Sequence, residues 1–222
     1  MDVLEPGADR PSGLPGPVTV TRAATALLAR VRAVEARVTR DVVERVGEHG
    51  GAIRDLDYRV KRPGSLARKM ADDVQILNLE PEIVAGRVND ALRYTVVLDA
   101  TQFSAGVTRI LGDLALRGYR VDQAKLWNFF IPANRYKGFH AVLSTPQQPD
   151  AAPPVVFEIQ FHTEQSLATK KATHGAYKVF RDPHRPLEAR RTTYDALVTR
   201  SADIEHPPGV EELGIPKPSH RP

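Results

Sequence analysis

The short apolar run at residues 155–161, VVFEIQF, carries a glutamate at its centre. Such a run predicts a buried β-strand. Because side chains two residues apart share a face of a strand, Glu158 and Gln160 are expected to point the same way. A carboxylate among apolar neighbours is destabilising unless it is paired or binds a metal ion. The fold must therefore give Glu158 a polar or metal-bound environment, or else leave it facing water on an edge strand.

Hydrophobic periodicity divides the rest of the chain into helices and strands. Apolar residues recur at helical spacing over residues 21–46, and the glycines of GEHGG at 47–51 end that helix. Further helices are expected at residues 65–77, 103–117, 163–180 and 186–200, and strands at 53–61, 91–98, 119–131, 138–144 and 155–161. This order predicts an α+β fold, in which helices surround a mixed β-sheet.

A chain of 222 residues can bury one sizeable core. Residues 1–19 are rich in proline and glycine and are expected to form a disordered arm. Residues 204–222 are expected to form a C-terminal tail. The folded domain is therefore expected at residues 20–203.

The net charge of +4 favours anionic partners such as nucleotides or nucleic acids. The chain has no cysteine, which excludes disulfides and thiolate metal sites. No apolar run is long enough to span a bilayer, and no signal peptide is visible, so no membrane association is expected. A cytoplasmic protein and a mature secreted protein both fit; the lack of cysteine fits the secreted one, which we expect.

Residues 59–69, RVKRPGSLARK, predict a basic strand, turn and helix. Arg59 and Lys61 would share one face of the strand, and Ser65 and Lys69 one face of the helix. Cationic side chains that converge at a helix N-terminus form a cradle for an anion. A solvated basic turn is the alternative interpretation.

Asp90 directly precedes the apolar strand at residues 91–98. Because the start of a strand holds its side chain in a fixed position, an aspartate there can present its carboxylate to a metal ion. An aspartate that simply begins a strand or turn is the alternative.

Taken in this order, the motifs resemble the synthetase domain of the RelA/SpoT family over about residues 53–181. Members of that family transfer the β,γ-pyrophosphate of ATP to the 3′-oxygen of a nucleotide. The resemblance implies a nucleotidyltransferase-like fold and a Mg²⁺ ion held by Asp90 and Glu158, with Glu158 helping to deprotonate the attacking hydroxyl. The residues that it implies for ATP binding are Arg59, Lys61, Ser65, Lys69 and Arg93.

Further motifs of the family concern the acceptor nucleotide. The turn RYKGF at 135–139 looks like the family's K-x-x-G-Y, and EIQFHT at 158–163 matches its E-I-Q-I-R-T. His174 lies where the family has the histidine of its E-H-K helix. The residues that the resemblance implies for acceptor binding are Arg135, Lys137, Phe139, Gln160 and His174. Three nearby lysines, Lys170, Lys171 and Lys178, are expected on a solvated helix face.

The chain also departs from the family pattern. Thr95 stands where the family has an arginine that stacks on the ATP adenine, so either Arg93 substitutes from a neighbouring position or the adenine is held differently. Phe139 replaces the tyrosine that stacks on the acceptor guanine, and Ala141 and Leu143 replace the serine and histidine that follow it. The residues that the family uses to bind the phosphates of ATP and the metal ion are present in this sequence, whereas the residues that it uses to recognise guanine are absent. The resemblance thus implies a purine acceptor held by stacking, with little choice between guanine and adenine, as in the divergent branches that make ppApp-type or ppGpp-type products.

Two alternatives stay open. A toxin-type relative would pyrophosphorylate the 3′ end of tRNA, but the sequence has no long basic stripe with interleaved aromatics of the kind that tracks RNA. A catalytically silent nucleotide-binding module has little need for both Asp90 and Glu158. The sequence leaves the oligomeric state and the acceptor open.

Overall fold

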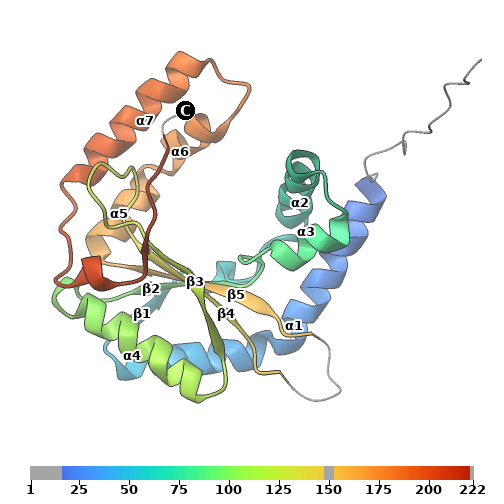
Figure 1. Cartoon of the computed structure of the whole chain (residues 1–222), viewed down its shortest axis with the longest axis horizontal. Helices are drawn as coiled ribbons and strands as arrows, with labels where there is room; N and C mark the ends of the chain where they lie inside the picture. The colour runs from blue at the N-terminus through green and yellow to red at the C-terminus, as the bar shows by residue number, and fades with distance from the viewer. Residues whose placement is uncertain (1–16, 148–152, 221–222) are drawn as a thin grey trace, which may run out of the picture.

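The structure is a computed structural model that describes residues 17–147 and 153–220. Within these residues it contains seven α-helices and one six-stranded sheet (Figure 1). The helices are α1 (Pro17–Glu48), α2 (Pro63–Leu77), α3 (Pro81–Arg87), α4 (Phe103–Leu116), α5 (Glu164–Ala172), α6 (His174–Arg181) and α7 (Leu187–Ala202). The strands are β1 (Ala52–Arg54), β2 (Arg93–Val97), β3 (Arg120–Asn128), β4 (Phe139–Ser144), β5 (Val156–His162) and β6 (Ile215–Pro216). The expected α+β architecture, a mixed sheet surrounded by helices, is confirmed.

The sheet has the strand order β1-β2-β5-β4-β3-β6. Strands β2 and β5 are parallel, as are β3 and β6, whereas the other neighbours are antiparallel. Strand β5 lies between β2 and β4, so Glu158 is not on an edge strand. Its carboxylate must be accommodated inside the fold.

The two faces of the central strands differ sharply in polarity. Toward α1 and α4, which lie on one side of the sheet (Figure 1), the strands present an apolar core. Its fully buried strand residues include Tyr94, Phe139, Leu143, Phe157, Ile159 and Phe161. Because strand side chains alternate, the intervening residues point to the other face. That opposite face carries the polar residues Arg93, Thr95, His140, Glu158, Gln160 and His162.

The remaining helices stand on either side of this polar face. Helices α2 and α3 pack on the long α1, while α6 packs along α7 and α5 follows directly after β5 (Figure 1). In the described residues, no helix combines the length and apolar character needed to cross a membrane.

Two expected elements are interrupted by local backbone geometry. The strand expected at 53–61 ends at Arg54, because Asp55 has a left-handed φ of 55° and a 3₁₀ turn follows at Leu56–Tyr58. Val60 forms only an isolated bridge with Leu92. The helix expected at 163–180 breaks at Thr173 into α5 and α6. Helix α3 was not expected.

The C-terminal residues do not trail away from the domain as expected. Within the described residues, Ile204 and Val210 are buried in the core, and β6 pairs with β3. The side chain of Asn128 donates to the carbonyl of Val210, and the backbone N–H of Lys217 to the carbonyl of Asn128 at 2.7 Å. The free energy gained by burying these apolar side chains offsets the conformational entropy that is lost when this Pro-rich segment becomes ordered. At the other end, residues 17–19 belong to α1, and the rest of the expected arm lies outside the described residues.

Candidate active site

The polar face is organised in rows that run across three strands. One row joins Val142 of β4, Glu158 of β5 and Arg93 of β2, which are successive register partners. The next row joins His140, Gln160 and Thr95. The backbone pairing therefore sets Glu158 beside Arg93, with a row of hydrogen-bonding side chains next to them.

Asp90 lies just before β2 and is held by two lysines. Nζ of Lys61 is 2.7 Å from Oδ2 of Asp90, and Nζ of Lys69, from α2, is 2.7 Å from Oδ1. Burial raises the pKa of Asp90, but the charges of Lys69 and Lys61 outweigh this effect and lower the pKa to about 2. Asp90 is thus an ionised carboxylate beside two ammonium groups.

Glu158 is only 6% exposed. Nε2 of Gln160 donates to its Oε1, and Nδ1 of His140 is 3.7 Å from the same oxygen. Burial raises the pKa of Glu158, the Gln160 hydrogen bond lowers it, and the negative charge of Asp90 raises it further. Glu158 is the register partner of Arg93, and its backbone N–H donates to the carbonyl of Leu92 at 3.0 Å, so the strand position of Glu158 lies close to the segment that carries Asp90.

Asp90 and Glu158 offer carboxylate oxygens, the kind of ligand that a magnesium ion takes in proteins. A divalent cation near both would relieve their mutual repulsion and offset the cost of burying Glu158. Mg²⁺ is commonly bound through one or two carboxylates together with waters and substrate phosphates. The described residues contain no cluster of three or more His, Asp or Glu side chains suited to a metal. Any Mg²⁺ here would therefore depend on phosphate oxygens and water for its other ligands.

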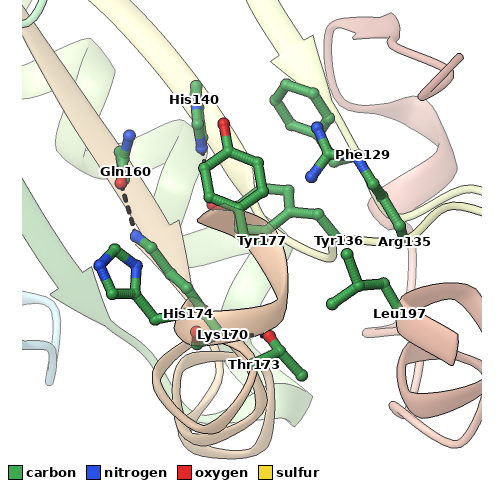
Figure 2. A pocket seen from close by; sticks show the side chains of 10 residues that line it. All are labelled: Phe129, Arg135, Tyr136, His140, Gln160, Lys170, Thr173, His174, Tyr177 and Leu197. Carbon is green, nitrogen blue, oxygen red and sulfur yellow. Dashed lines mark hydrogen bonds between the residues drawn. The ribbon is translucent and has the colours of Figure 1, made fainter. Parts of the chain in front are cut away.

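A cavity of about 310 Å³ opens beside the second polar row. Side chains from the β3–β4 connection, β4, β5 and helices α5 to α7 surround it (Figure 2). They are Phe129, Arg135, Tyr136, His140, Gln160, Lys170, Thr173, His174, Tyr177 and Leu197. Ligand pockets of this size, with aromatic walls and a few convergent polar groups, are typical of small-molecule sites.

No protein-family model and no curated protein matches the sequence. Among solved structures, small alarmone synthetase 2 from Bacillus subtilis is similar, with a TM-score of 0.53 and 16% identity over 80% of this chain and 89% of that chain. The chain has the fold of a small alarmone synthetase. The structure of smu.1046c from Streptococcus mutans UA159 is also similar, with a TM-score of 0.46 and 14% identity over 83% of this chain and 89% of that chain. Small alarmone synthetase 1 from Bacillus subtilis bound to its product pppGpp has a TM-score of 0.44 and 15% identity over 76% of this chain and 86% of that chain.

On this alarmone-synthetase fold, the residues expected for ATP binding separate into two groups. Lys61 and Lys69 meet at Asp90, and Arg93 lies beside Glu158. Arg59 does not join them. Its guanidinium donates to the carboxylate of Glu35 in α1 and, at 2.9 Å, to the carbonyl of Leu56.

The separation of Arg59 has a local cause. The 3₁₀ turn at Leu56–Tyr58 leaves Arg59 with a helical backbone conformation (φ −62°, ψ −36°), so Arg59 and Lys61 do not share a strand face. Ser65, in the first turn of α2, is exposed.

The residues expected for acceptor binding also divide. Arg135, Gln160 and His174 line the cavity, whereas Lys137 and Phe139 do not. Phe139 is 1% exposed and packs against Phe161 in the core, because strand alternation turns it toward α4.

Lys137 is likewise unavailable to a ligand in the cavity. It is 3% exposed, and its ammonium donates to the carbonyl of Ile131. Burial lowers its pKa. The aromatic surface expected from Phe139 comes instead from Phe129, Tyr136 and Tyr177.

Lys170 is a site residue that the sequence interpretation missed. Instead of lying on a solvated face, its Nζ reaches into the cavity and donates to Oε1 of Gln160 at 2.7 Å (Figure 2). Burial and the charge of Arg93 lower the pKa of Lys170 to about 8. Helical spacing could have found it, because Lys170 follows the buried Ser166 and Leu167 at i+4 and i+3.

Of the other two lysines expected on a solvated face, Lys171 is exposed and pairs with Asp55. Lys178 is exposed as expected. Arg135 lines the far wall of the cavity, with its guanidinium carbon 5.0 Å from the ring centre of Tyr177 and 4.8 Å from that of Phe180. Burial lowers the pKa of Arg135.

Proposed function

We propose that the chain transfers the β,γ-pyrophosphate of ATP to the 3′-hydroxyl of a purine nucleotide and releases AMP. The observation that carries the proposal is that β5, which bears Glu158, pairs with β2 directly after Asp90, next to two lysines and an aromatic cavity. The fold of a small alarmone synthetase agrees with it.

Lys61, Lys69 and Arg93 form the donor side of the site. ATP phosphates compete well for lysine ammonium groups, so binding would exchange the bonds of Asp90 with Lys61 and Lys69 for bonds to phosphate. Asp90 would then be free, with Glu158, to hold Mg²⁺. When bound, Mg²⁺ would neutralise phosphate charge and orient the triphosphate.

The cavity forms the acceptor side. A purine fits against the rings of Tyr136 and Tyr177, and Arg135, Lys170 and His174 supply positive charge or hydrogen-bond donors at its walls. Glu158, next to Gln160 on β5, would accept the proton of the 3′-hydroxyl. The 3′-oxygen then forms a bond to the β-phosphorus, the bond from that phosphorus to the α,β-bridging oxygen breaks, and AMP leaves with that oxygen. Such a reaction depends mainly on positioning and charge neutralisation.

Labelled ATP tests the proposal directly. The purified chain is incubated with Mg²⁺ and either α-labelled or γ-labelled ATP, with AMP, ADP, GDP, GTP or tRNA as acceptor. Transfer predicts γ-label in a new nucleotide product and α-label in AMP, and both disappear in EDTA. Release of γ-label as free phosphate, or no turnover with any acceptor, would refute the proposal; label in tRNA alone would reassign the acceptor.

A further inference from the structure

Tyr136 lies at the centre of a hydrogen-bond network that the resemblance does not include. Its hydroxyl is 2.7 Å from Nε2 of His140 and 3.0 Å from Nε2 of His162. His162 in turn contacts Ser166 through Nδ1, at 3.0 Å, and Lys170 through Nε2, at 3.2 Å. The network thus connects β4, β5 and α5, and its members Tyr136, His140 and Lys170 line the cavity (Figure 2).

The turn before β4 is built to allow this arrangement. A Cβ atom on Gly138 would lie 2.7 Å from Oη of Tyr136 and 3.0 Å from Cε1 of His162. Any larger residue at this position would push the Tyr136 hydroxyl away from its partners. Gly138 is therefore needed for close approach rather than for an unusual backbone angle.

The direction of each hydrogen bond follows from Lys170. An ammonium group only donates, so Nε2 of His162 is the unprotonated nitrogen and its Nδ1–H donates to Ser166. The Tyr136 hydroxyl faces the same lone pair, which it shares with Lys170, so it turns its proton and not an oxygen lone pair toward His162. The tyrosine oxygen then accepts from Nε2–H of His140, which leaves Nδ1 of neutral His140 as an acceptor.

This free acceptor points at the catalytic carboxylate. Nδ1 of His140 is 3.7 Å from Oε1 of Glu158, too far for a hydrogen bond between them. An oxygen donor can nevertheless lie at about 2.8 Å from both atoms, on one side of the line that joins them. A hydroxyl group in that gap can share its single proton between the two acceptors in a bifurcated hydrogen bond.

We infer that Tyr136 is a positioning residue, which orients His140 so that His140 Nδ1 and Glu158 Oε1 together receive the attacking hydroxyl of the acceptor. The inference rests on the proposed function, since it names further residues of the same site. His140 contacts the reacting group, and Tyr136 acts through His140. The ring of Tyr136 has a separate role as part of the cavity wall.

Removing only the hydroxyl tests the inference. Tyr136→Phe is expected to lower kcat about 10- to 100-fold, the usual effect of losing a supporting hydrogen bond at a site, while KM for the acceptor is unchanged because the ring remains. His140→Gln removes Nδ1 and is expected to lower kcat as well. Because Tyr136 acts through His140, the double variant should be no slower than His140→Gln alone.

Two further variants separate this role from a general structural one. Tyr119→Phe also removes a buried hydroxyl, one that donates to Asp41 at 2.8 Å on the opposite side of the sheet, and should keep normal kcat. Gly138→Ala should reproduce the kcat loss of Tyr136→Phe. Additive losses in the double variant, or normal kcat in Tyr136→Phe, would overturn the inference.

A measurement that does not require turnover can test the inference about Tyr136 and His140 separately from the proposed function. Nitrogen NMR of the imidazoles is expected to show His140 protonated at Nε2 in the wild type and as a mixture of tautomers in Tyr136→Phe. A wild-type His140 protonated at Nδ1 would refute the inference even if transfer occurs. If the wild type makes no product with any acceptor, the proposed function and the catalytic part of the inference fall together.

Discussion

Nζ of Lys170 lies 2.7 Å from Oε1 of Gln160. Nε2 of the same glutamine donates to Glu158, so one side chain links the ammonium of α5 to the buried carboxylate of β5. Both groups are withdrawn from water, and the pKa of each is shifted toward its neutral form, mainly by burial. A cation and an acid poised in this way are typical of sites that handle protons and phosphates.

Replacing Lys170 should impair transfer. Lys170→Met removes a hydrogen bond from a charged group, which is commonly worth about 1.5–3 kcal/mol, so kcat/KM is expected to fall about 10- to 100-fold. In the wild type, activity should also decline above about pH 8, where the ammonium loses its proton. Lys171→Met is the matched control, because Lys171 is exposed, and it should remain near wild type. Equal activity of both variants would contradict the role of Lys170.

Glu158→Gln should abolish turnover without weakening the fold. Loss of a positioned proton acceptor costs about 10²- to 10⁴-fold in kcat. The pKa of Glu158 is raised in the folded chain, so folding takes up protons and the stability contributed by this group falls as pH rises past its unfolded pKa. At pH 7 in EDTA, the glutamine variant should therefore melt at or above the wild-type temperature. A marked drop in Tm would show that the ionised carboxylate stabilises the fold.

Asp90→Asn should show the opposite pH dependence. The pKa of Asp90 is lowered from 3.8 to about 2, so its contribution is present above pH 3.8 and is lost as pH falls through 2. The shift corresponds to about 2 kcal/mol of stability at neutral pH. Denaturant unfolding from pH 7 to pH 2 should show the gap between wild type and variant closing below pH 4. A gap that stays constant would exclude this ionic contribution.

Arg59 and Glu35 should behave as one structural pair. Each is partly buried, so removing one leaves the other without its partner and costs about 1–3 kcal/mol. Arg59→Ala and Glu35→Ala should each lower the free energy of unfolding, and the double variant should be less destabilised than the sum of the two. The KM for ATP tests whether Arg59 binds ATP, as the resemblance implies. If it rises strongly in Arg59→Ala and not in Glu35→Ala, Arg59 binds ATP despite its bond to Glu35.

Truncation after Gly214 should loosen the acceptor side of the site. The removed segment pairs with β3, and the carbonyl of Lys217 accepts from Asn134 at 2.8 Å. The hydroxyl of Ser219 accepts from the backbone N–H of Arg135 at 3.3 Å. The truncated chain is expected to have a lower Tm and a higher KM for the acceptor, with less change in KM for ATP. Unchanged values would mean that the segment is dispensable.

Much of the fold could be predicted because the local signals were strong. Strand β5 and helix α4 follow from apolar runs bounded by turn residues, and they occur close to the expected positions. The predicted elements were wrong where a single backbone angle ended a strand, or where a segment paired with residues far away in the sequence. The left-handed angle at Asp55 ends a strand that its sequence favours, and the pairing of β6 with β3 depends on residues far apart in the chain.

The sequence alone determined that Glu158 lies in the middle of an apolar strand, where an unpaired buried charge is costly, but it left open whether that strand is at an edge of the sheet. It also determined the alternation that sends Phe139 and His140 to opposite faces, since that follows from strand geometry once the register is known. Only the tertiary structure decided which face met the core. Packing against α4 buried Phe139, and the approach of α5 brought Lys170 to Gln160, because burial depends on neighbours from other elements rather than on local spacing.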